Sequence, residues 1–74
     1  MDKIQKAIYQ NKVDKGFNIT NVELEFCLLQ GEVSEAYEAY AKKLPTLGEE
    51  LADVAIYLYG LAEILGYDLY EEIQ

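Results

Sequence analysis

Two long stretches of this chain repeat apolar residues at the spacing of an amphipathic helix. In the first stretch, steps of four and three alternate through Val22, Phe26, Leu29, Val33, Ala36 and Tyr40. In the second stretch, the same steps run through Leu47, Leu51, Val54, Leu58, Leu61 and Leu65. A helix presents residues at this spacing on one face, and such a face packs against another helix. We therefore predict two packed helices that meet along these apolar stripes.

The residues around the stripes indicate where the helices begin and end. Three segments resemble a capping box, in which an N-cap oxygen accepts from an amide three residues later: Thr20–Glu23, Thr46–Glu49 and Asp68–Glu71. Pro45 prevents the first long helix from continuing, and Gly66 suits the left-handed position after the second. The prediction is an all-α fold with an antiparallel helical hairpin at about 20–43 and 46–65, flanked by short helices at about 2–14 and after residue 68.

The chain has 74 residues, which we interpret as a single helical domain, 1–74. A chain of this length buries only roughly 60% of its unfolded surface, so its core is marginal. Cys27 is the only cysteine, and we expect it to be a small core residue. The chain contains no histidine, which argues against a structural zinc site. Oligomerisation or metal binding is therefore the expected source of extra stability.

Charge excludes two classes of partner. The formal net charge is −8, from fourteen acids against six lysines. Nucleic acids and anionic membranes both require a basic surface, so neither is an expected partner. The N-terminus has no apolar signal sequence, and no apolar run approaches about 18 residues, so the expected location is cytoplasmic. An apolar content of 51% is too high for a disordered acidic tail.

Two acidic pairs accompany the apolar stripes. Glu32 and Glu35 lie three residues apart in the first long helix, and Glu50 and Asp53 do so in the second. Each pair lies on one face of its helix, and a hairpin that turns near residues 42 and 43 brings the two pairs to the same height. Four carboxylates beside an apolar core repel one another, so they either take up protons or bind a cation. All-oxygen ligation suits Mg²⁺ or Mn²⁺.

The acids, and two glycines inside the predicted helices, also have simpler structural interpretations. Acids three residues apart are common on solvated helix faces. Gly31 and Gly60, which lie inside the predicted helices, each cost up to about 1 kcal/mol relative to alanine. For Gly60 we favour close helix packing, whereas Gly31 is consistent either with packing or with room for a ligand beside the acids.

The motifs GEVSEAYEA and EELADVAIYL resemble the two acidic motifs of the MazG-like, all-α nucleoside triphosphate pyrophosphatase family. The resemblance runs from about residue 15 to the end of the chain and includes the apolar segment DVAIYLYGLAEILG. It implies that Glu32, Glu35, Glu50 and Asp53 bind Mg²⁺ and that a nucleoside triphosphate is cleaved to a monophosphate and pyrophosphate. It also implies a homodimer or homotetramer whose subunits complete a four-helix-type bundle. Glu35 is the predicted catalytic residue, which orients or deprotonates the attacking water.

Two positions depart from the family pattern. Gly31 stands where the family often has a further glutamate, and the chain ends at Gln74, about where family members carry a lysine and an asparagine that contact the substrate. Phosphate contacts then come from Lys12, Lys15 or a neighbouring subunit, or activity is reduced or lost. Tyr57 matches a family position that is aromatic in some members, which is consistent with sugar or base binding and equally with an ordinary core tyrosine.

The sequence therefore supports two functional hypotheses. The first is a Mg²⁺-dependent pyrophosphohydrolase of a (deoxy)nucleoside triphosphate, acting in nucleotide-pool cleaning. The second is a non-catalytic acidic helical interaction module, or a degenerate relative that binds nucleotide. The chain contains no P-loop, GxGxxG motif or Ser/His/Asp set. Apolar surface at Tyr37, Tyr40, Ile56 and Tyr59 predicts oligomerisation under both hypotheses.

Overall fold

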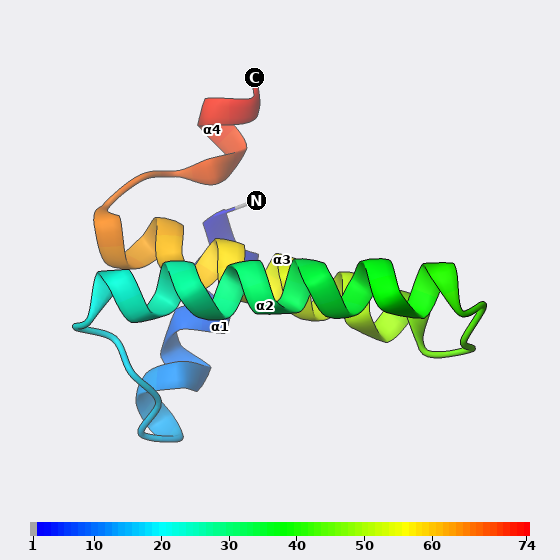
Figure 1. Ribbon diagram of the computed structural model, residues 1–74. Helices are drawn as coiled ribbons and strands as arrows, with labels where there is room; N and C mark the ends of the chain where they lie inside the picture. The colour runs from blue at the N-terminus through cyan, green and yellow to red at the C-terminus, as the bar shows by residue number, and fades with distance from the viewer. Residues whose placement is uncertain (1) are drawn as a thin grey trace.

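The computed structural model describes residues 2–74 and is helical, with no strand in that range (Figure 1). Its four helices are α1 (Asp2–Asp14), α2 (Val22–Ala41), α3 (Leu47–Leu65) and α4 (Leu69–Ile73). The prediction of an all-α fold is confirmed. None of these helices is both long enough and apolar enough to cross a membrane.

Helix α3 is the centre of the arrangement. Helix α2 runs antiparallel to α3 along its length, and α1 packs against α3 near the end away from the α2–α3 turn (Figure 1). Helix α4 contacts α1. Because α1 covers only part of the α2–α3 pair, the half nearest the turn has no third helix over it.

Side-chain caps define two of the helix starts. The Oδ1 atom of Asn21 accepts a hydrogen bond from the Leu24 amide at 3.0 Å, so Asn21, and not the predicted Thr20, is the N-cap of α2. The Oδ1 atom of Asp68 accepts from the Glu71 amide at 3.2 Å, which confirms the predicted cap of α4. Thr46 precedes α3, but the described structure gives its side chain no capping bond.

Hydrogen bonds from the side chain of Gln5 connect α1 to the end of α3 and to the segment between α3 and α4. Its Nε2 donates to Glu63 Oε1 at 2.9 Å and to the Tyr67 carbonyl at 2.6 Å. Its Oε1 accepts from the Leu69 amide at 3.0 Å. Gln5 is buried, and all three bonds satisfy polar groups that burial would otherwise leave without water. The chain turns between these helices at Gly66, whose φ of 84° confirms its predicted left-handed conformation.

The helix contact differs by one position from the predicted apolar stripes. Ala36 and Leu61 are buried as predicted, but Val33 and Leu51 are 50% and 56% exposed. The side of α2 that meets α3 instead carries Glu25, the half-buried Glu32, Ala36 and Ala39, at steps of seven, four and three. The predicted stripes therefore form, for the most part, the border of the helix contact rather than its centre.

A large apolar surface is left uncovered. The structure exposes 5318 Å², whereas a monomeric protein of this mass is expected to expose roughly 4,600 Å². Seven of its exposed apolar residues, here called the uncovered face, are Phe26, Val33, Tyr37 and Tyr40 of α2 and Leu51, Leu58 and Leu65 of α3. Helix geometry puts them on the side of the pair that α1 does not cover. Cys27 is exposed too, so its predicted place in the core is wrong.

Candidate functional site

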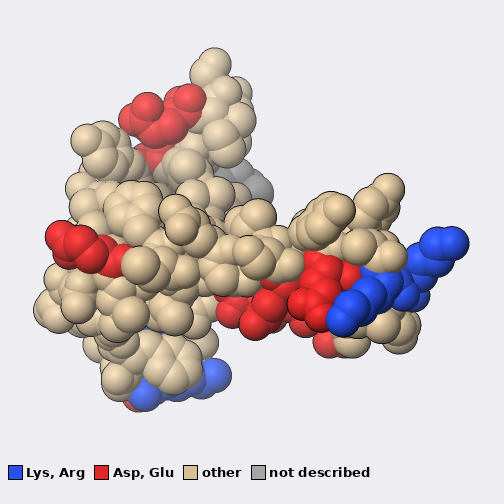
Figure 2. Space-filling view, viewed as in Figure 1, with Lys and Arg blue, Asp and Glu red and all other residues tan. Residues whose placement is uncertain are grey.

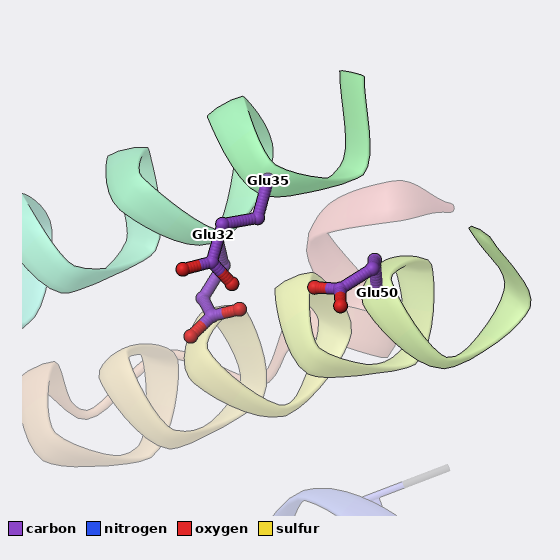
Figure 3. A group of neighbouring side chains, drawn as sticks. All are labelled: Glu32, Glu35 and Glu50. Atoms are coloured by element: carbon purple, nitrogen blue, oxygen red, sulfur yellow. The ribbon is translucent and has the colours of Figure 1, made fainter. Parts of the chain in front are cut away.

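Three of the predicted metal ligands come together between α2 and α3 (Figure 3). Glu32 and Glu35 extend from α2 toward α3, and Glu50 extends from α3 toward them. Each contributes one carboxylate oxygen, and the three oxygens lie within 4.8 Å of one another. These residues are called the acidic cluster below. The i, i+3 spacing on α2 and the antiparallel course of α3 bring the side chains to the same height.

Two carboxylates of the cluster each have one oxygen that is buried without a hydrogen-bond partner within residues 2–74. The Oε2 atoms of Glu32 and Glu50 are inaccessible to solvent, and neither has a hydrogen-bond partner among the described residues. Burial, and then the negative charges of Glu35 and Asp53, raise the pKa of Glu32 above its ordinary value. The pKa of Glu50 is raised by the same causes in the same order. When these carboxylates are ionised, their buried oxygens require a nearby cation or a hydrogen-bond donor.

Asp53 lies beside the cluster without being one of its three closest members. It is half-buried on α3, one turn after Glu50, and its charge acts on both Glu32 and Glu50. The space-filling view shows acidic side chains gathered along one edge of the helix pair, next to the lysines at the turn (Figure 2). One of these, Lys42, forms an ion pair with Glu38 at 2.6 Å.

The chemistry of the acidic cluster fits a hard divalent cation. Carboxylate oxygens are the ligands that Mg²⁺ and Mn²⁺ prefer, and two of those present here are buried without a donor. A cation held by Glu32, Glu35 and Glu50, with Asp53 adjacent, would lower the repulsion that raises the pKa of Glu32 and Glu50.

Lys12 and Lys15, the predicted phosphate contacts, lie in different environments. Lys15 is exposed in the turn after α1. Lys12 is only 5% exposed, and its ammonium group donates to Glu25 Oε1 in a buried ion pair. The same ammonium lies over the ring of Tyr57, 5.0 Å from its centroid.

Glu25 is a buried polar residue that the sequence pattern did not single out. It is 2% exposed, and besides Lys12 it binds Asn18, whose Nδ2 donates to Glu25 Oε2 at 3.0 Å. Its position seven residues before Glu32 places it on the same helix face, two turns away. This spacing from Glu32 could have indicated that Glu25 lies on the helix face of the acidic cluster, but the apolar residues around it, Phe26 and Leu28, drew the prediction to the apolar stripe instead.

A pocket of about 520 Å³ is lined by residues of α1, of the α1–α2 connection, of α2 and of α3. We call it the α1 pocket. Its polar lining residues are Asn11, Lys12, Asn18, Glu25 and Tyr57, and its apolar lining residues are Ile4, Ala7, Ile8, Phe17, Leu28 and Ile56. Tyr57 is half-buried and lies one turn beyond Asp53 on α3. Burial, followed by the charges of Glu32, Glu25, Asp53 and Glu35, raises the pKa of its hydroxyl. Tyr57 therefore lies between the α1 pocket and the acidic cluster.

Comparisons with protein-family models, with curated proteins and with solved structures found no match to this chain.

Proposed function

We propose that this chain is a Mg²⁺-dependent nucleoside triphosphate pyrophosphohydrolase that uses the acidic cluster as its metal site. The observation that carries the proposal is the pair of buried, unpartnered oxygens on Glu32 and Glu50, close to a third carboxylate from Glu35. An anionic protein binds a triphosphate only through cations, and a cluster of this kind is where they would bind. Bound there, Mg²⁺ or Mn²⁺ would polarise the α-phosphate and stabilise the departing pyrophosphate.

The chain's own residues take distinct parts in this proposal. Glu32 and Glu50, which have buried oxygens, are suited to holding the metal, and Asp53 adds negative charge beside them. Glu35 is exposed, so its carboxylate can be reached by a water molecule from solvent. Its part is to orient that water and accept its proton during attack on the phosphorus.

The same proposal includes a second copy of the chain. The uncovered face consists of apolar side chains from both helices, and the surplus of exposed surface, roughly 700 Å², is close to what each partner buries in a standard interface. Packing two such faces together would give a four-helix bundle built from α2 and α3 of each copy. The acidic clusters would lie on its outer sides, because helix geometry puts their residues away from the uncovered face.

The direct test is release of pyrophosphate from a panel of ribo- and deoxyribonucleoside triphosphates with Mg²⁺ and with Mn²⁺. We expect turnover of at least one nucleotide, complete loss in EDTA, and a loss of at least a hundredfold for Glu50→Ala. Glu71→Ala, which removes an exposed acid on α4, is the matched control and should retain activity. Absence of turnover across the whole panel with both metals would refute the hydrolase proposal.

A non-catalytic module is the second candidate, and one observation favours it. Lys12, the cation expected to hold phosphate, is engaged by Glu25 inside the α1 pocket, and Lys15 lies in an exposed turn. A degenerate relative would bind nucleotide or a protein partner without cleaving it. Equilibrium binding of a triphosphate in Mg²⁺ with no pyrophosphate release would favour this candidate over the enzyme.

A further inference from the structure

The α1 pocket has the size and wall chemistry of a site for a small, mostly apolar ligand. Its volume of about 520 Å³ is within the range of small-molecule sites. Phe17 and Ile8 contribute apolar wall, and the ring of Tyr57 lies at its border with the acidic cluster. Flat ring systems bind well between such side chains because stacking and area burial act together.

A buried ion pair in this apolar wall is unexpected on grounds of stability alone. Removing Lys12 and Glu25 from water is costly, and apolar side chains of similar volume commonly stabilise a fold as well or better. The pair does, however, give the pocket one group that only donates hydrogen bonds and one that only accepts them. Lys12 gives one hydrogen bond to Glu25, and each carboxylate oxygen of Glu25 accepts one, so both groups have capacity for a further bond. Because the two residues are only 5% and 2% exposed, a ligand would meet that capacity at the inner wall of the pocket.

The ligand that matches this wall is a planar heteroaromatic ring with an acceptor and a donor side by side on one edge. Nucleobases carry such an edge, either as a lactam (C=O beside N–H) or as an amidine (ring N beside NH₂). Asn18 is less available for reading a ligand, because its amide group already bonds Glu25, the Asn21 carbonyl and the Asn21 amide. Lys12 and Glu25 are therefore the selecting pair.

The pocket and the acidic cluster are at a suitable separation for one ligand. Glu25 and Glu32 are seven residues apart on α2, which is about 10 Å along a helix. Tyr57 and Asp53, one turn apart on α3, connect the two sites on the other side. A nucleotide with its base in the pocket could thus extend its phosphates toward the cluster over the ring of Tyr57.

We propose that the α1 pocket binds the nucleobase of the nucleotide, with Lys12 and Glu25 selecting its polar edge. This inference rests on the proposed function for the position of the phosphates, but base binding itself requires neither metal nor turnover. It changes the part of Lys12 from a phosphate contact to a base contact. It also makes inorganic triphosphate, which has no ring, a poor ligand.

The first test is an NMR titration of the full chain with adenosine, guanosine, cytidine and uridine in EDTA. We expect saturable shifts at α1 and at Tyr57 for at least one nucleoside, with a Kd in the millimolar range or tighter. Ala7→Trp, at an exposed position in the pocket lining, should weaken binding at least tenfold by filling the pocket. Ala52→Trp, exposed on α3 outside the pocket, is the control and should bind as the wild type does.

The second test addresses the selecting pair. The double variant Lys12→Met/Glu25→Met keeps the volume of the wall without its charges, and denaturation first verifies that it is folded. It should bind benzimidazole riboside, whose ring lacks an exocyclic donor, at least as well as the wild type does, while its affinity for the preferred nucleoside falls about tenfold or more. Unchanged nucleoside affinity in the folded double variant would show that the pair does not select the base.

The outcomes separate this inference from the proposed function. Nucleoside binding without any turnover would support the pocket and count against the hydrolase. Turnover with no saturable nucleoside shift, and with Ala7→Trp as active as the wild type, would overturn the pocket and leave the hydrolase in place. If a nucleoside that binds does not compete with its triphosphate, the pocket is not the base site of the substrate, and the inference is wrong.

Discussion

The side chain of Lys12 runs directly over the backbone of Gly60. A β-carbon at Gly60 would lie 3.0 Å from Lys12 Cδ, closer than ordinary van der Waals contact. Lys12 cannot easily move, because its ammonium is fixed by Glu25. The predicted packing reason for this helical glycine is therefore confirmed: α1 crosses α3 at Gly60, where α3 has no side chain in the way.

Substituting this glycine should destabilise the protein despite alanine's higher helix propensity. We expect Gly60→Ala to cost about 1–3 kcal/mol in the free energy of unfolding, because the added methyl overpacks a fixed contact. Gly31→Ala is the matched comparison, because a methyl group added there would meet no described atom within 4 Å beyond its own helix and chain neighbours. That change should stabilise by up to about 1 kcal/mol. Urea denaturation measures both, and equal effects would contradict the contact.

The buried pair of Lys12 and Glu25 predicts a strongly non-additive mutant cycle. Glu25→Met leaves the ammonium of Lys12 buried without its partner and should cost about 3–5 kcal/mol. The double change Lys12→Met/Glu25→Met should recover most of that loss. The exposed pair of Lys42 and Glu38 is the control, because Lys42→Met should cost no more than about 1 kcal/mol. Additive losses in the buried cycle would contradict the ion pair.

The raised pKa values of Glu32 and Glu50 predict how the metal-free protein responds to pH. The two carboxyl groups bind their protons more tightly in the folded state than in the unfolded state, where each has a pKa near 4.5. Their contribution to stability is thus complete below pH 4.5 and is lost as pH rises through the folded pKa. Glu32→Gln/Glu50→Gln should flatten this loss and raise the Tm at pH 7 in EDTA. Parallel pH profiles for variant and wild type would contradict the assigned repulsion.

The uncovered face predicts self-association. Sedimentation should show a species larger than the 8.4 kDa monomer at micromolar concentration. Leu51→Lys/Leu58→Lys introduces charge into the centre of the face and should shift the protein toward monomer. Ile73→Lys, at an exposed apolar position on α4 outside the face, should not. A wild-type chain that stays monomeric under these conditions would rule out the second copy.

The sequence predicted the helices better than it predicted their contact. Expected boundaries at about 20–43 and 46–65 lie within two residues of α2 and α3, because apolar period and turn residues act locally. The contact was assigned to the residues with the strongest apolar period, such as Val33 and Leu51, which are half exposed. Buried polar side chains such as Glu25 do not contribute to the apolar periodicity of the sequence. Their burial depends on a hydrogen-bond or charge partner from another part of the fold, which the local sequence does not reveal.

The same limit applies to the two polar sites. Spacing of three within each helix, together with a hairpin that turns near residues 42 and 43, was enough to predict that Glu32, Glu35 and Glu50 come together, although Asp53 lies beside this group rather than in it. It was not enough to pair Lys12 with Glu25, because their contact depends on where α1 crosses the hairpin. Lys12 was a predicted phosphate contact because the chain lacks the lysine that family members carry in their last helix, and only the fold revealed that Glu25 already binds Lys12. Of Ile56 and Tyr59, expected on an oligomer surface, Ile56 lines the α1 pocket and Tyr59 is half-buried.

The proposed binding of a divalent cation by the acidic cluster can be measured by titration calorimetry with Mg²⁺ and with Mn²⁺. Binding should release or absorb heat in the wild type and raise its Tm in proportion to the logarithm of excess metal. Both effects should disappear in Glu32→Gln/Glu50→Gln and persist in Glu71→Gln/Glu72→Gln, which removes the same charge from α4. Metal binding that is absent from the wild type, or equal in both variants, would contradict the proposed site.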